Sequence, residues 1–180
     1  MAPRRDQAQI RLERTAGWVL LAGSAFLILA ALLFGAIEAG NEWLAPWQSA
    51  ALVIGLLVTL FGLISLEEAL AANGERLLPR FGTVAFAIGT TSFVVADALG
   101  QATGQFTFEL ERLYAVLACV AIALFGWSIL RSRSLPAAVG WFAIAWAVID
   151  GALYLARILQ APLGPNIVTL LFGLALVRRR

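Results

Sequence analysis

The chain contains no histidine and no lysine, since every one of its basic residues is an arginine. Without histidine it cannot form a His-ligated haem or zinc site, a Ser-His or Cys-His catalytic pair, or an imidazole proton relay. Without lysine it cannot form the Schiff base that retinal or pyridoxal phosphate requires. These absences remove much of enzyme chemistry, so we expect a protein that is not an enzyme and that has no cofactor and no metal site.

Cysteine and charge are also scarce. The single cysteine, Cys119, cannot form an intramolecular disulfide or hold an iron–sulfur cluster by itself, and we expect it to pack as a small apolar side chain. Only 13% of the 180 residues are charged, whereas 61% are hydrophobic. The net charge of +2 comes from arginines spread along the chain, which does not indicate nucleic-acid binding.

Long apolar runs dominate the sequence instead. Runs of about 18–23 residues match a hydrocarbon core ~30 Å thick at ~1.5 Å per residue, so we predict an all-α fold, a polytopic membrane helical bundle. Residues 1–14 form a polar N-terminal segment, and residues 15–180 form a single membrane domain. Six transmembrane helices are predicted at about residues 15–37, 47–66, 81–99, 113–130, 136–156 and 165–177.

The first and last runs each have an alternative interpretation. Run 15–37 follows a basic start, as a signal peptide does. It is longer than the apolar region of a signal peptide and no clear cleavage site follows, so we interpret it as a retained span. Run 165–177 reaches only ~20 Å, which predicts either a crossing helped by snorkelling arginines and local thinning or a half-span.

The arginines predict the orientation of these spans. With the N-terminus inside, eleven of the thirteen fall on the inner side: Arg4, Arg5, Arg11, Arg14, Arg76, Arg80, Arg131, Arg133, Arg178, Arg179 and Arg180. Only Arg112 and Arg157 fall outside. The positive-inside rule predicts this asymmetry. We therefore expect a multi-pass protein of the cell inner (plasma) membrane with both termini in the cytoplasm.

A three-residue motif closes each of the three return helices. Its copies are Leu60-Phe61-Gly62, Leu124-Phe125-Gly126 and Leu171-Phe172-Gly173, and the outgoing helices open with Gly17, Gly82 and Gly140. The pattern suggests three repeated helical hairpins, in which each closing glycine lies against a neighbouring helix. Chance recurrence is the alternative, because Leu33-Phe34-Gly35 carries the same triplet in the wrong half of a hairpin.

Polar residues gather at the predicted outer end of the bundle. This polar cluster consists of Asp97, Gln101, Arg112, Asp150, Tyr154 and Arg157. Each aspartate shares a helix face with later members of the cluster, at a spacing of four or seven residues. One interpretation is a helix–helix ion pair between an aspartate and an arginine, and the other is a site for a polar ligand, an ion or a proton. The usual sequence contexts of the two aspartates of an intramembrane protease are absent.

The C-terminal third resembles a recurring type of small multi-spanning membrane protein of unknown function from high-GC bacteria. The residues that carry the resemblance are Leu135-Pro136, Gly140-Trp141, Pro162, Pro165, Leu171-Phe172-Gly173 and Arg178-Arg179-Arg180. The resemblance implies an α-helical inner-membrane protein and brings no active site. It covers residues 135–180 only.

Two functional hypotheses follow from these patterns. The first is an integral membrane protein that serves as a non-enzymatic structural or accessory subunit, since small residues suit close helix packing and no catalytic set is present. The second is a small transporter or ligand-binding membrane protein that uses the polar cluster. The expected partners are the lipid bilayer and either further copies of the chain or another member of a membrane complex, with no nucleic acid.

Overall fold

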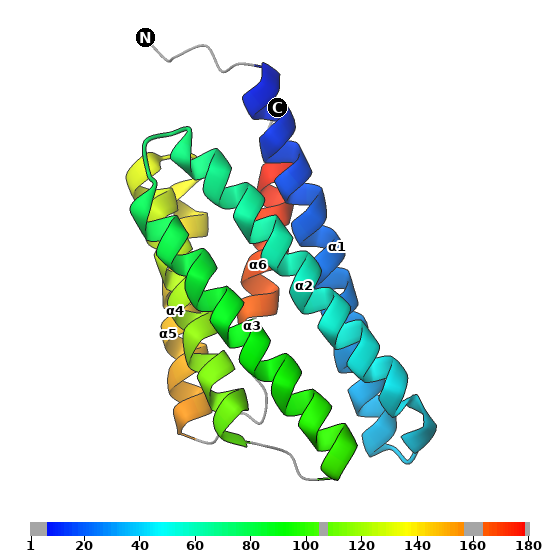
Figure 1. Cartoon of the computed structure of the whole chain (residues 1–180). Coiled ribbons are helices and arrows are strands. Elements are labelled where there is room, and N and C mark those ends of the chain that lie inside the picture. The colour runs from blue at the N-terminus through cyan, green and yellow to red at the C-terminus, as the bar shows by residue number, and fades with distance from the viewer. Residues whose placement is uncertain (1–6, 105–107, 157–163, 179–180) are drawn as a thin grey trace.

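The computed structural model describes residues 7–104, 108–156 and 164–178 (Figure 1). In these residues it consists of α1 (Gln7–Glu38), η1 (a short 3-10 helix, Glu42–Leu44), α2 (Ala45–Ala71), α3 (Leu77–Thr103), α4 (Phe108–Ser132), α5 (Ala137–Leu155) and α6 (Gly164–Val177). The predicted all-α bundle is therefore confirmed. Helices α1 to α5 are long and apolar enough to cross a membrane. Helix α6 reaches only ~21 Å at ~1.5 Å per residue, so its crossing stays a prediction.

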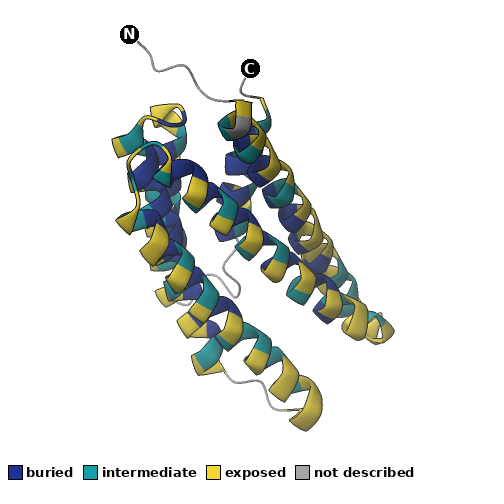
Figure 2. Cartoon of the chain, turned by 45° about the horizontal axis from the view of Figure 1, so that its top comes forward, coloured by how far each residue is buried: buried dark blue, intermediate teal, exposed yellow. Residues whose placement is uncertain are grey.

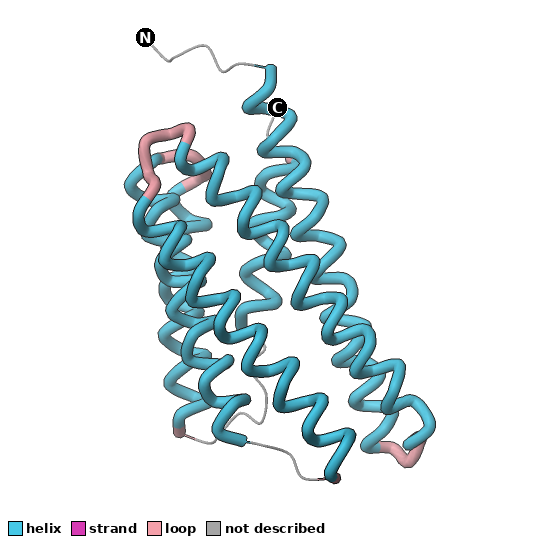
Figure 3. The backbone as a smooth tube through the Cα atoms, viewed as in Figure 1, coloured by secondary structure: helices cyan, strands magenta, loops and turns pink. Residues whose placement is uncertain are grey.

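Each predicted apolar run lies within one helix, apart from one residue at each end of the fifth run, and most of the helices continue beyond their runs. The largest extension is in α1, which begins at Gln7, so residues 7–14 of the predicted polar segment continue the first helix. The helices extend beyond the apolar runs because backbone hydrogen bonds form in the same way whether the side chains face lipid or water. Short loops join α1 to α2, α2 to α3 and α4 to α5 (Figure 3).

Glycines with left-handed backbone end two of the helices. Gly74 follows α2 with φ +92°, and Gly104 caps α3 with φ +68°. An L-residue with a Cβ atom is strained at these angles, whereas glycine is not. Next to Gly74, the Asn73 side-chain amide donates a hydrogen bond to the carbonyl of Ala69 at 2.8 Å.

The helices form a closed bundle in which the last helix returns to the first. Helix α1 packs along α2, α3 packs along α4, and α4 packs along α5. Helix α6 lies against α1, α5 and α4, and it makes most of its contacts with α1. The start of α1 and the end of α6 consequently lie at one end of the bundle, here called the terminal end, and the α1–α2 loop lies at the distal end (Figure 1).

Apolar side chains cover the outside of the bundle, and small polar side chains occupy parts of its interior. Large exposed residues occur on every long helix, among them Trp18, Leu32, Phe61, Leu77, Phe81, Val116 and Val148. Figure 2 shows the buried residues facing inward between the helices. Ser24 of α1 and Thr169 of α6 are both buried and share a hydrogen bond of 3.2 Å. This inside-out distribution fits a surface that contacts lipid rather than water.

Two seams between helices are closed by pairs of glycines. A Cβ atom added at Gly173 would lie 2.9 Å from the carbonyl oxygen of Gly17, and one added at Gly17 would lie 3.0 Å from the carbonyl oxygen of Gly173. Gly126 and Gly140 face each other in the same way, at 2.8 Å in both directions. In each pair the closing glycine of one return helix meets the opening glycine of the next outgoing helix. Both pairs place a closing glycine against a neighbouring helix, as the hairpin repeat predicts; the pairing with an opening glycine is a further finding.

The third seam, between α2 and α3, departs from this pattern. Gly62 packs against Leu20 of α1, where a Cβ would lie 2.7 Å from a Leu20 methyl carbon, and Gly82 packs against Phe125 of α4. All three closing glycines therefore contact a neighbouring helix, as predicted, but the glycine pairing repeats at only two of three seams. Gly35, from the misplaced copy of the triplet, has no atom within 4 Å of its added Cβ.

We expect Gly126→Ala to destabilise the bundle. The new methyl group would lie 2.8 Å from the carbonyl oxygen of Gly140, and backbone atoms can yield only if α4 and α5 separate. Overpacking of this kind costs about 1–3 kcal/mol, measurable as a lower midpoint of unfolding in detergent. The matched control is Gly35→Ala, which meets open space and should keep or raise stability by up to about 1 kcal/mol. Equal midpoints for Gly126→Ala and wild type would contradict the described α4–α5 contact.

Candidate functional site

Part of the predicted polar cluster ties α2 to α3 at the distal end. The Ser49 hydroxyl of α2 donates a hydrogen bond to Oδ2 of Asp97 on α3. The side-chain amide of Gln101 donates to Ser49 Oγ at 2.6 Å and to Asp97 Oδ2 at 2.9 Å. The three side chains thus form a closed triangle across the helix pair.

This triangle follows from local sequence. Asp97 and Gln101 are one helical turn apart, so both side chains reach the same neighbouring helix. Ser49 lies near the start of the antiparallel helix α2 and is buried, so its hydroxyl needs a partner. Each member satisfies another member, which offsets the cost of removing these groups from water.

A second polar group joins α4 to α5. Asp150 of α5 is only 3% exposed, and the Cys119 thiol of α4 donates a weak hydrogen bond to its Oδ2 with a sulfur–oxygen distance of 3.9 Å. One turn further along α5, the Tyr154 hydroxyl donates to the carboxylate of Glu111, which is 8% exposed. The interface therefore holds two buried carboxyl groups, each with a neighbour on the opposite helix.

Charged and aromatic neighbours complete this second group. The exposed Arg112 lies close enough to Glu111 and Tyr154 to interact with both electrostatically. On the other side, the buried ring of Tyr114 interacts electrostatically with Asp150. That ring also packs edge-to-face on Phe93 of α3, with ring centroids 5.1 Å apart. The buried Asp150 carboxyl thus has a thiol and a phenol among its neighbours, and burial gives a negative charge there a desolvation cost.

The contacts that the structure shows for the predicted cluster fall on two helix pairs. Asp97 and Gln101 come together on the α2–α3 pair. Asp150, Tyr154 and Arg112 belong to the α4–α5 pair. The suggested ion pair between Asp97 and Arg112 is not among the contacts of the described residues. Arg157, the sixth predicted member, lies outside the described residues.

Three participants were not part of the predicted cluster. Ser49 was overlooked, although a small polar residue opening a span beside Asp97 was a usable signal. Glu111 precedes the predicted span 113–130, yet it is buried in the first turn of α4. Cys119 was expected to pack as an apolar side chain, and it does pack against Gly151, but its thiol also reaches Asp150.

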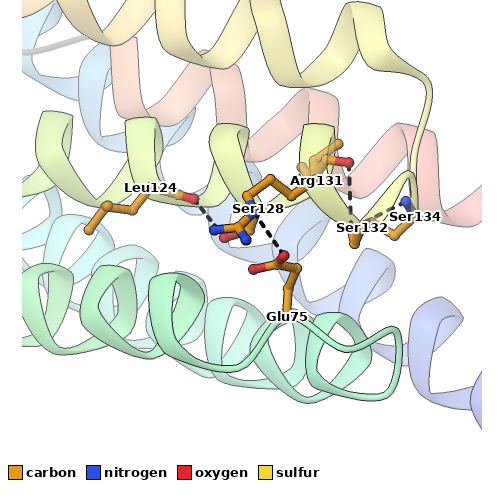
Figure 4. Close-up of polar contacts among 7 residues, drawn as sticks. Glu75, Leu124, Ser128, Arg131, Ser132 and Ser134 are labelled. Carbon is orange, nitrogen blue, oxygen red and sulfur yellow. Dashed lines mark hydrogen bonds and ion pairs between the residues drawn. The ribbon is translucent and has the colours of Figure 1, made fainter.

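The terminal end carries its own polar contacts, drawn in Figure 4. Arg131 at the end of α4 forms an ion pair with Glu75 of the α2–α3 loop, with nitrogen and oxygen 3.1 Å apart. The hydroxyls of Ser132 and Ser134 lie 2.9 Å apart across the turn that leads to α5. These contacts fix the loop between α4 and α5 against the preceding hairpin.

No group of three or more His, Cys, Asp or Glu residues close enough to hold a metal ion occurs in the described parts of the chain. The chemistry available to the α4–α5 group is hydrogen bonding and proton exchange among two carboxyls, a phenol and a thiol. The chemistry available to the α2–α3 triangle is hydrogen bonding alone. No family model, curated protein or solved structure matches this chain.

We expect Ser49→Ala to weaken the α2–α3 seam. The change removes the hydroxyl that links Asp97 and Gln101 to α2, so two interhelical hydrogen bonds are lost. Hydrogen bonds between membrane helices contribute about 0.6–2 kcal/mol each, and the unfolding midpoint in detergent should fall accordingly. The control is Ser92→Ala on α3, whose hydroxyl bonds only to the Ile88 carbonyl of its own helix. If both variants unfold like the wild type, the triangle does not hold the helices together.

Proposed function

We propose that this chain is an integral membrane protein that acts as a non-enzymatic structural or accessory subunit. The observation that carries the proposal is the use made of polar side chains inside the bundle. Ser49 bonds to Asp97, Glu111 to Tyr154, and Ser24 to Thr169, so each contact joins two neighbouring helices. Polar groups used in this way stabilise a defined helix arrangement, which is what a scaffold requires.

The proposal places the protein in the inner membrane of a bacterial cell with both termini in the cytoplasm. The arginine distribution supports this orientation. Exposed tryptophans near both bundle ends support two membrane–water interfaces. At the terminal end these are Trp18, Trp127 and Trp141, and at the distal end Trp43 and Trp47. Tryptophan favours the headgroup level of a bilayer, so these side chains fit two interfacial belts.

The partners proposed for this subunit are the lipid bilayer and either further copies of the chain or another membrane protein. Support comes from the apolar outer surface, which suits lipid and helix contacts alike. Glycine-mediated contacts such as Gly126 with Gly140 show that the chain's own helices can approach at backbone distance. No nucleic-acid partner is proposed.

We expect the protein to be extracted from a native membrane as a complex with further copies of itself or with another membrane protein. A tagged and an untagged copy would be expressed together, extracted in mild detergent and purified through the tag. The expected result is recovery of the untagged copy, or of a second membrane protein in constant ratio, with a particle mass above that of one chain. In the control, membranes that contain only the tagged copy and membranes that contain only the untagged copy are extracted separately and then mixed. Any untagged copy recovered from this mixture has exchanged after solubilisation. A lone 19.3 kDa chain in the detergent particle would contradict the subunit role.

One observation favours a second candidate function. Asp150 and Glu111 are carboxyl groups buried between α4 and α5. Ionisable groups in membrane helices are costly, and in many membrane proteins they mark the path of an ion, a proton or a polar substrate. A small transporter or ligand-binding membrane protein centred on these two carboxyls is therefore the second candidate.

Asp150→Asn separates the two candidates. The amide has the shape of the carboxyl but no charge, so a scaffold should keep its fold and its partner. Under the subunit proposal, vesicles containing either form conduct protons and monovalent ions no faster than protein-free vesicles. Asp97→Asn, which lies on the other helix pair, is the matched control. The transporter role would be favoured over the subunit role if the wild-type protein conducts ions, Asp150→Asn abolishes that flux and Asp97→Asn retains it.

A further inference from the structure

An open groove of about 490 Å³ lies at the terminal end of the bundle, between the last turn of α6 and the beginning of α5. Its lining consists of Arg133, Leu135, Pro136, Ala175 and Arg178. The volume falls within the range of small-molecule sites, ~300–1,000 Å³. The groove therefore combines two cationic side chains with three apolar residues.

The two arginines come from distant parts of the sequence and share this groove. Their neighbour Arg131 differs from them, because its charge is offset by Glu75 in the ion pair of Figure 4. Within the described parts of the chain, neither Arg133 nor Arg178 forms an ion pair with an acidic side chain. Two like charges on one groove repel each other, and a bound anion would relieve that repulsion.

The backbone at Arg133 is also unusual. Its φ of +51° is the only positive value at a non-glycine residue in the described chain. The turn is held in this form by the Ser132 hydroxyl, which accepts a hydrogen bond from the Ser134 backbone N–H at 3.3 Å and contacts the Ser134 hydroxyl. Glycine would adopt this angle without strain, so arginine at this position is an energetic cost that packing does not require.

The level of the groove along the bundle matches that of lipid headgroups. Trp127 precedes Arg133 by six residues, or ~9 Å along the helical axis, and Trp141 follows Pro136 by five residues, or ~7.5 Å. Both indole rings are exposed. Because tryptophan marks the boundary of the hydrocarbon, the groove begins where phosphates of the same leaflet lie.

We propose that this groove binds the headgroup of an anionic phospholipid. Arg133 and Arg178 contact the phosphate, for which the guanidinium fork is well suited, while Leu135, Pro136 and Ala175 receive the glycerol and first methylene groups. A free phosphate ion would satisfy the arginines but leave the accessible surface of Pro136 and Ala175 uncovered. A zwitterionic lipid would satisfy the apolar residues but bring its own cation toward the arginines.

The test is lipid binding by the full-length protein in mild detergent, followed by native mass spectrometry. Phosphatidylglycerol, phosphatidylcholine and inorganic phosphate are titrated separately. We expect the protein to bind phosphatidylglycerol about tenfold or more tightly than phosphatidylcholine. Each of the two arginines adds a favourable electrostatic interaction with an anionic headgroup near a membrane surface, and the two contributions add. Millimolar inorganic phosphate should not displace the bound lipid.

Three variants identify the groove as the site. Arg178→Gln removes one charge, and Arg133→Gly removes the other while relieving the strained backbone, so its loss of lipid cannot be attributed to unfolding. Each should lower the preference several-fold, and together they should abolish it. Arg80→Gln, an equal charge change on the exposed surface of α3, should leave it unchanged. Equal binding of the two lipids, displacement by phosphate alone, or a preference that survives the double change would each overturn the proposal.

Discussion

Helices surrounded by hydrocarbon gain little by exchanging lipid contacts for leucine contacts, so this bundle depends on how closely its backbones approach. At Gly17 with Gly173, and at Gly126 with Gly140, a single added methyl group would meet a carbonyl oxygen of the neighbouring helix. Such proximity lets side chains on both sides of each glycine make many dispersion contacts. The Gly17–Gly173 pair matters most for architecture, because it seats the short helix α6 against α1. The position of α6 in turn brings Arg178 beside Arg133.

The seam without a glycine pair carries a polar contact in its place. Between α2 and α3, where Gly62 and Gly82 each turn to another helix, the triangle of Ser49, Asp97 and Gln101 joins the two helices. Nearer the terminal end, the loop after α2 is fixed to α4 by the Glu75–Arg131 ion pair. The bundle thus uses two means of helix association, backbone proximity at glycines and hydrogen bonding between side chains. Both occur at the α1–α6 and α4–α5 seams, whereas the α2–α3 seam has the polar contact without a glycine pair.

The sequence predicts the helices of this protein better than the contacts between them. Apolar runs, the Asn73-Gly74 turn and the closing glycines depend on local composition, which can be counted along the chain. The partner of Asp97 depends on how far α2 and α3 are rotated about their axes. A helix that is apolar nearly all round gives no stripe from which that rotation could be inferred. For this reason the sequence indicates the members of the polar cluster but not their partners, which the structure places on two helix pairs.

Because the chain has no lysine, every cation at the terminal end is an arginine, and this affects how the terminal end can bind phosphate. An ammonium group meets phosphate as a point charge, whereas a guanidinium presents a planar set of donors that can bind two phosphate oxygens at once. A chain whose every cation is arginine can therefore hold headgroups with defined geometry and still obey the positive-inside rule. Arg131 shows the alternative use of the same side chain, since it is committed to Glu75 within the protein. Arg133 and Arg178 have no such commitment among the described residues, and both line the groove at the terminal end. Under the proposed orientation, the arginines that would keep the terminal end in the cytoplasm are thus also available to bind the lipid around it.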